Sequence, residues 1–296
     1  MRLRLLVTMS LSVVVILIAA SLQPAQANST VTIVAVGDIA RYNGGQAKTA
    51  ALTKNLKPRY VLLLGDLVYK NGTKKEFNKY FLPKWRSLMS KAWAIPGNHE
   101  YRTANAAGYR SLISKYSMPA TSGNLWWVKR TGAWSIIGLD SEALTGATGD
   151  KQLEFLRQAL ASNNGRPTIV TWHRPTFSRG YHGNQSDTLE LWNLVIADQD
   201  VKLVLWGHDH NYEQVQRTVQ PGTPSEHKVN TILVGTGGAD LRKCSTPNIL
   251  GELICGKKNN YGVLQLKLKS NGYSWSYRNA NGQKLGRQLD SGRVTF

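Results

Sequence analysis

Residue types that bind metal ions follow the apolar runs of this chain, at the point where each predicted strand ends. The turn Gly37-Asp38 follows one run, Gly65-Asp66 follows a second, and Gly207-His208-Asp209-His210 follows a third. Glycine at such positions lets the backbone turn sharply and approach a ligand closely. Two further runs end similarly, so five strand ends together carry two aspartates, one asparagine and four of the six histidines: Asp38, Asp66, Asn98, His99, His173, His208 and His210.

This donor set indicates a metal centre. Oxygen and imidazole donors without a thiolate suit zinc, iron or manganese, and they argue against a structural zinc site. Taken singly, an aspartate after a glycine is usually a turn or helix-cap residue, and a buried histidine is usually a hydrogen-bonded core residue. The joint placement of four histidines at strand ends favours a dinuclear site over this structural alternative.

The elements that must position these residues alternate between strands and helices. Short runs rich in valine, isoleucine and leucine predict buried strands over 31–36, 60–64, 92–95, 168–172 and 201–206. Helical spacing between them predicts helices over 47–56, 75–90, 150–161 and 188–197. The alternation favours an α/β fold, in which ligands bind beyond the carboxyl ends of the strands.

Other segments predict antiparallel strands. Residues 125–130 and 134–139 flank Thr131-Gly132 as in a hairpin, and strands are predicted over 231–234, 261–269 and 273–278. The sheets are therefore expected to be mixed. Without an internal repeat, a low-complexity segment or a linker in the sequence, we expect one domain over residues 28–296.

The first 27 residues have the layout of a secretory signal peptide. Arg2 and Arg4 precede an apolar stretch over 5–20, and Ala25-Gln26-Ala27 matches a cleavage site. The alternative is an uncleaved anchor, although the stretch is short of the roughly 20 residues that span a bilayer. We expect a secreted or periplasmic protein, cleaved near Ala27. Export favours a disulfide between the only two cysteines, Cys244 and Cys255.

The chain is strongly basic, with 37 lysines and arginines against 18 acidic residues and a formal net charge of +19. Such a surface attracts phosphorylated substrates, polyanions and anionic cell envelopes. The basic residues are scattered and no nucleic-acid-binding motif accompanies them, so no specific nucleic-acid partner is predicted. Solubility or retention at the cell surface explains the charge at least as well as nucleic-acid binding does.

Five blocks of the sequence resemble the metal-binding blocks of the purple acid phosphatases, which are calcineurin-like metallophosphoesterases. The blocks are Asp38, Gly65-Asp66-x-x-Tyr69, Gly97-Asn98-His99-Glu100, Val170-x-x-His173 and Gly207-His208-x-His210. The resemblance implies a four-layer α-β-β-α sandwich with mixed sheets. It also implies that one metal is bound by Asp38, Tyr69 and His210, that Asp66 bridges, and that the other metal is bound by Asn98, His173 and His208.

The resemblance further implies a phosphatase that hydrolyses phosphomonoesters by attack of a metal-bound hydroxide, and the layout of residues 1–27 predicts that it is exported. A tyrosinate from Tyr69 implies Fe(III) for the first metal, and the second would be Zn, Fe or Mn; a hydrogen-bonded core tyrosine is the alternative. His99 and His182 are the candidate catalytic residues outside the metal ligands. Two other functions remain open, namely a phosphodiesterase acting on nucleotides or lipid headgroups and a non-catalytic envelope protein that binds polyanions.

Overall fold

The computed structural model describes residues 30–244, 252–255, 261–280 and 286–296, so the predicted signal peptide lies outside the described residues. One sheet has six strands in the order β13-β12-β11-β1-β2-β3. Its parallel half comprises β1 (Val31–Val36), β2 (Tyr60–Leu64) and β3 (Ala92–Ile95). Its antiparallel half comprises β11 (Gly262–Lys269), β12 (Gly272–Asn279) and β13 (Gln288–Thr295).

The second sheet has seven strands in the order β10-β8-β9-β7-β6-β5-β4. Its central strands run parallel: β5 (Trp134–Gly138), β6 (Thr168–Thr171), β7 (Val201–Trp206) and β9 (His227–Val234). Antiparallel strands complete it: β4 (Trp127–Thr131), β8 (Tyr212–Val219) and β10 (Glu252–Ile254). Both sheets are mixed, as the sequence predicted.

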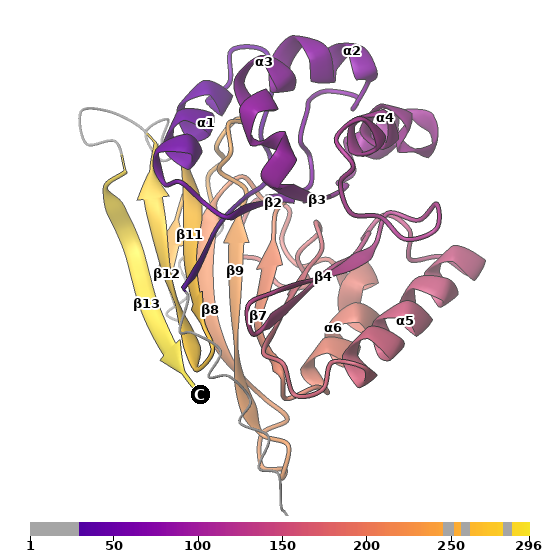
Figure 1. Cartoon of the computed structure of the whole chain (residues 1–296), viewed down its shortest axis with the longest axis vertical. Helices are drawn as coiled ribbons and strands as arrows, with labels where there is room; N and C mark the ends of the chain where they lie inside the picture. The colour runs from indigo at the N-terminus through magenta and orange to yellow at the C-terminus, as the bar shows by residue number, and fades with distance from the viewer. Residues whose placement is uncertain (1–29, 245–251, 256–260, 281–285) are drawn as a thin grey trace, which may run out of the picture.

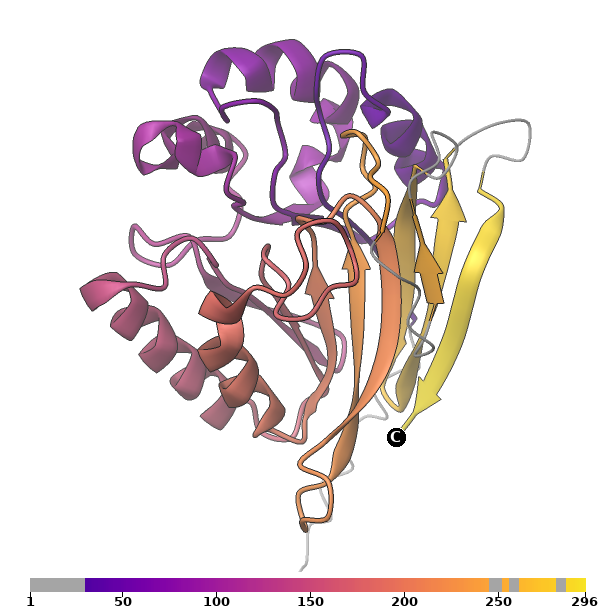
Figure 2. The same ribbon diagram turned by 180° about the vertical axis from the view of Figure 1, so that it is seen from behind.

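Helices cover the outer face of each sheet (Figures 1 and 2). The first sheet is covered by α1 (Gln46–Asn55), α2 (Lys74–Glu76), α3 (Leu82–Trp85) and α4 (Ala107–Lys115). The second sheet is covered by α5 (Gly146–Ala161) and α6 (Leu189–Ile196). Short 3₁₀ turns occupy Arg86–Lys91, Glu100–Arg102, Ala104–Ala106 and Ser186–Thr188.

Three layers of apolar side chains hold the four structural layers together. Along β1, Ile33 and Ala35 face the core between the sheets, whereas Val34 and Val36 face the helices. Because the strand is buried on both sides, its sequence is apolar without alternation. The predicted four-layer α-β-β-α sandwich is confirmed.

The helix predicted over 75–90 is wrong as a single element. A capping box between Thr73 and Glu76 starts it, but the segment then passes through a π-helical turn (Phe77–Phe81), α3 and a 3₁₀ turn. Pro83 lies inside it and lacks the N–H that would bond the carbonyl one turn earlier. The chain therefore changes its helical geometry near this residue.

Two further features bear on the predicted export. Cys244 and Cys255 form the predicted disulfide, with their Cα atoms 5.6 Å apart. In the part of the chain that the structure describes, no helix is both long and apolar enough to cross a membrane.

Candidate metal centre

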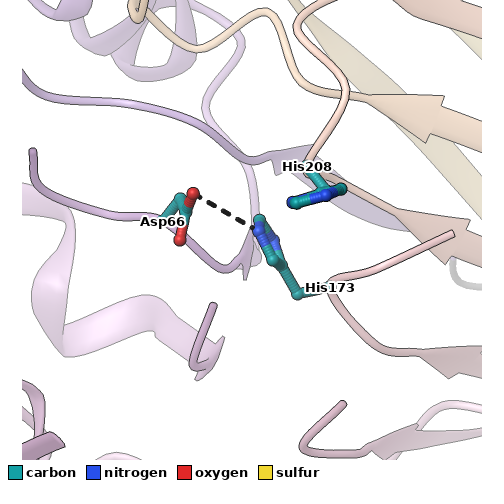
Figure 3. A group of neighbouring side chains, drawn as sticks. All are labelled: Asp66, His173 and His208. Atoms are coloured by element: carbon teal, nitrogen blue, oxygen red, sulfur yellow. Dashed lines mark ion pairs between the residues drawn. The ribbon is translucent and has the colours of Figure 1, made fainter. Parts of the chain in front are cut away.

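The predicted ligands come from the strand ends of both sheets. Asp38, Asp66 and Asn98 follow β1, β2 and β3 of the first sheet, and the histidines follow β6 and β7 of the second. Figure 3 shows Asp66 facing His173 and His208 across this junction. Asp38, Asp66 and His208 have φ angles of 58°, 49° and 73°. Such left-handed backbone costs roughly 1–3 kcal/mol per residue and is concentrated at functional sites.

Two glycines are required by the close approach of the loops. A Cβ atom at Gly97 would lie 2.4 Å from Oδ1 of Asp66, and one at Gly65 would lie 2.5 Å from Nδ1 of His173. Gly65 also has a φ of 84°, which side chains disfavour. The glycines of the strand-end motifs therefore make room for the side chains of the predicted ligands.

The first cluster of predicted ligands converges on the hydroxyl of Tyr69. This oxygen lies 2.8 Å from Oδ1 of Asp38, 3.1 Å from Oδ2 of Asp66 and 3.0 Å from Nε2 of His210. Burial, Asp38 and Asp66 raise the pKa of Tyr69 well above its usual value. The hydroxyl thus keeps its proton in this environment, and only a cation bound at the same point can convert it to tyrosinate.

The second cluster lies on the other side of Asp66. Oδ2 of Asp66 is 3.4 Å from Nε2 of His173, and the ligand atoms of Asp66, His173 and His208 all lie within 4.8 Å of one another. Oδ1 of Asn98 is 2.9 Å from Nδ1 of His208. Asp66 therefore belongs to both clusters, which is the position that a bridging carboxylate requires.

Backbone carbonyls fix the orientation of three imidazole rings. A carbonyl can only accept a hydrogen bond, so the facing Nδ1 carries the proton and Nε2 is left as the donor atom for a ligand. The Nδ1–carbonyl pairs, at 2.6 to 2.8 Å, are His99 with Lys70, His173 with Leu64 and His210 with Asp240. His208 differs, because its Nδ1 faces the side chain of Asn98.

The donor set fits a cation. Nε2 of His173 is buried and has no hydrogen-bond partner in the structure. Burial lowers the pKa of this histidine, but the attraction of Asp66 and Asp38 outweighs burial and raises it to about 10. The buried Asp66 is in turn held ionised by His173, which lowers its pKa far below the usual range. The local field thus favours a positive charge beside His173, where the ligand atoms converge.

Glu100 holds the loops of the first sheet together. Its buried carboxylate accepts hydrogen bonds from the backbone N–H groups of Asp66 and Leu67 at 2.9 Å, and from that of Gly97 at 2.8 Å. Burial and Asp66 raise its pKa to about 8. Glu100 therefore orients the loop backbone that carries Asp66 and Gly97.

The two candidate catalytic histidines both lie beside these clusters. Nε2 of His99 is 3.8 Å from Oδ2 of Asp66, and burial lowers the pKa of His99 although Asp66 opposes this effect. The exposed ring of His182 stacks on that of His208, with centroids 4.5 Å apart. The backbone N–H of His182 donates to Oδ1 of Asp209 at 2.8 Å. Asp209, between two predicted ligands in the sequence, was missed as the residue that holds this loop.

A cavity of about 540 Å³ opens beside the first cluster and includes Tyr69, His99 and His210 in its wall. Four cationic side chains also line it: Arg41, Lys70, Arg102 and Arg242. Arg41 pairs with Asp240. Arg174, which follows the predicted ligand His173 in the sequence, binds both carboxylate oxygens of Glu142 at 2.6 and 3.0 Å. Arg242 was missed because only the fold brings it here.

The fold and this site together define a metallophosphoesterase, as predicted. The chain belongs to the calcineurin-like phosphoesterase family, whose sequence model matches residues 31–212. It is 24% identical over 301 residues to tartrate-resistant acid phosphatase type 5 of Oryctolagus cuniculus, covering 88% of this chain and 90% of the relative. It is 22% identical to purple acid phosphatase 17 of Arabidopsis thaliana, covering 64% and 65% of the two chains. The purple acid phosphatase-like character expected from the five blocks is thereby confirmed.

Solved structures share the fold. Purple acid phosphatase PPD1 from yellow lupin (Lupinus luteus) superposes with a TM-score of 0.75 at 19% identity, over 91% of this chain and 54% of that one. GAP50, the anchor in the inner membrane complex of Plasmodium, superposes with a TM-score of 0.68 at 16% identity, over 90% and 89%.

Proposed function

We propose that the protein is an exported phosphatase that hydrolyses phosphomonoesters with two metal ions. The observation that carries this proposal is the position of Asp66, whose Oδ2 lies 3.1 Å from the hydroxyl of Tyr69 on one side and 3.4 Å from Nε2 of His173 on the other. One ion would be held by Asp38, Asp66, Tyr69 and His210, and the other by Asp66, Asn98, His173 and His208. When bound, such a pair supplies a nucleophile near neutral pH and charge that stabilises the phosphoryl group.

The protein's own residues orient the substrate and move a proton. The ring of His99 is fixed by its bond to the carbonyl of Lys70, and its Nε2 is turned toward Asp66. From there a protonated His99 can donate to the leaving oxygen or to a phosphoryl oxygen. His182 lies over His208, beside Arg242, and can contact the same phosphoryl group.

Charge supports a phosphomonoester over a phosphodiester. A monoester carries nearly two negative charges at neutral pH, whereas a diester carries one. The cavity is lined by four cations, and its two carboxylates are both engaged: Asp240 pairs with Arg41, and Glu76 accepts backbone N–H groups of its own loop. The positive charge that remains in the cavity favours binding of the doubly charged phosphomonoester. Phosphodiester hydrolysis by the same residues is the alternative.

The proposed compartment is the periplasm or the extracellular space. Residues 1–27 begin with basic residues, continue with an apolar stretch and end with small residues, as a secretory signal peptide does. The disulfide between Cys244 and Cys255 also supports this compartment.

A second candidate function is anchoring without catalysis, which the fold shared with GAP50 brings into consideration. The arrangement of His99, a histidine beside the ligands but not among them, favours catalysis.

Turnover of an aryl phosphate, compared with that of the matching diester, tests this proposal. We expect the monoester to be hydrolysed faster, and dialysis against a chelator should abolish the activity, with recovery on adding iron plus zinc or manganese. Faster turnover of the diester would favour the phosphodiesterase. Failure to hydrolyse either ester, with two metal ions bound per chain, would favour the anchor.

Tyr69→Phe tests whether iron occupies the first position. A tyrosinate bound to Fe(III) absorbs visible light, so the wild-type protein loaded with iron should be coloured. The variant keeps the ring but loses the oxygen that lies 2.8 Å from Asp38, so the band should vanish while folding is retained. Absorption spectra and metal analysis measure this. A colourless iron-loaded wild type, or an unchanged band in the variant, would contradict tyrosinate ligation.

A further inference from the structure

The outer face of β11, β12 and β13 extends beyond the helices that cover the rest of the first sheet (Figure 1). At one end of this face, Val263 and Ala280 pack in the apolar layer beneath the helices. Farther along the same strands, outward positions carry Lys267, Ser274 and Arg293, whereas the inward residues of β11 and β12 remain apolar. The outward side of these strands is therefore polar where the described helices leave it uncovered.

The strand register places these residues in rows. Lys267, Ser274 and Arg293 are direct neighbours across the three strands, and the next outward row contains Gln265, Ser276 and Ser291. Adjacent strands lie about 4.8 Å apart, so the two cations of the first row are separated by about 10 Å. Arg278 lies one row farther on. Hydroxyl and amide groups thus alternate with cations across a continuous face.

A groove of about 350 Å³ runs over this face, and none of the described residues in its wall is acidic. Lys267, Arg278 and Arg293 all line it. The carboxylate of β13, on Asp290, lies on the opposite side of the sheet, where it accepts bonds from Tyr212 and Trp275. The cavity beside the metal centre, by contrast, includes two carboxylates among its cations.

Arg278 is the least exposed of the three cations of the groove. Its Nη atoms contact the side chain of Gln265 at 3.3 Å and the carbonyl of Gly286 at 3.2 Å, and both contacts are to uncharged groups. Its Nε atom is buried without a hydrogen-bond partner. An anionic oxygen in the groove would supply the charge that these contacts lack.

We propose that this face binds an extended anionic polymer whose phosphate or sulfate groups contact Lys267, Arg278 and Arg293. A polymer fits better than a lipid surface, because none of the exposed large apolar side chains, Tyr42, Tyr181, Leu189 and Phe296, lines the groove. The face is also remote from the metal centre, since Lys267 pairs with Thr32 at the start of β1 and Asp38 follows the other end of that strand. The inference does not depend on the proposed phosphatase activity.

Binding of dextran sulfate, which a phosphatase does not consume, tests the proposal. The double variant Lys267→Glu with Arg293→Glu should bind at least about tenfold more weakly than wild type at low salt, and its salt dependence should have a slope smaller by about 1.5, because two ionic contacts are lost. The matched control is Lys84→Glu with Lys129→Glu, which makes the same change of net charge at two exposed lysines outside the groove. The control should stay within about twofold of wild type.

Equal weakening in the two variants would overturn the proposal, because net charge alone would then explain binding. Absence of binding by wild type would also overturn it, and so would preference for phosphatidylglycerol vesicles over dextran sulfate. Thermal unfolding checks that both variants fold. If the charge reversal disturbs the sheet, the double variant Lys267→Gln with Arg293→Gln replaces it in the binding measurement. Aryl phosphate turnover should be unchanged in all variants, and a parallel loss of turnover would contradict a separate site.

Discussion

Asp66→Asn is expected to remove bound metal and phosphatase activity together. An asparagine fits the same space but supplies one neutral oxygen, whereas the carboxylate faces Tyr69 at 3.1 Å and His173 at 3.4 Å. Loss of a partner outside the ligand set typically costs about 10–100-fold in metal affinity, and loss of a shared ligand should cost more. Metal analysis after gel filtration and turnover of an aryl phosphate measure the two losses.

The control for this variant is Asp290→Asn. Asp290 is also an aspartate in a hydrogen-bonded cluster, but it contacts Tyr212 and Trp275 rather than any predicted ligand. An asparagine there can still accept both bonds, so metal content and turnover should be close to those of wild type. If Asp66→Asn retained two metal ions per chain with normal turnover, the bridging assignment would be wrong.

His99→Ala is expected to keep both metal ions and to lose turnover by roughly the 10²–10⁴-fold that general acid–base groups contribute. The reason is geometric: the Nδ1–H of His99 is occupied by the carbonyl of Lys70 at 2.6 Å, which leaves Nε2 directed at the reaction site rather than at the backbone. Loss of metal in this variant would make His99 a ligand and would overturn the division between ligands and catalytic residues.

The leaving group separates the two possible roles of His99. If the histidine donates a proton to the leaving oxygen, an alkyl phosphate should lose more turnover than a nitrophenyl phosphate, whose leaving group needs no proton. If it only contacts the phosphoryl group, both substrates should lose equally and KM should rise. His227→Ala is the matched control, because His227 begins β9, whereas the metal centre lies at the strands' carboxyl ends. Its kinetics should match those of wild type.

The strand-end pattern made the fold and the location of the candidate site predictable. A glycine precedes each of Asp38, Asp66 and His208. This pattern can be recognised locally, because adjacent residues form the turn after the strand and supply the predicted metal ligand. Apolar runs likewise predicted the buried parallel strands. Edge strand β13 was not predicted, because its sequence, Gln288–Thr295, is polar or half-buried along its length and gives no apolar alternation.

Contacts between distant segments could not be read from the sequence. Glu100 is next to His99, yet three of the backbone N–H groups that it accepts from are 32 to 34 residues away. Arg242 reaches His182, 60 residues earlier, only through the fold. Arg174 adjoins the predicted ligand His173 but is turned toward Glu142. Proximity in sequence to a predicted ligand therefore predicted which residues lie near the candidate metal centre, but not the direction in which each side chain points.

The division of the donor set between two sheets has a mechanical consequence. The predicted ligands Asp38, Asp66 and Asn98 belong to one sheet and His173, His208 and His210 to the other, so each of the two proposed ions would link the two sheets. Ligand binding to the native state alone adds about 2.7 kcal/mol of stability when the free ion is at one hundred times its Kd. Any sliding of the sheets would separate the donors. We therefore expect removal of the metal ions to lower the temperature at which the protein unfolds.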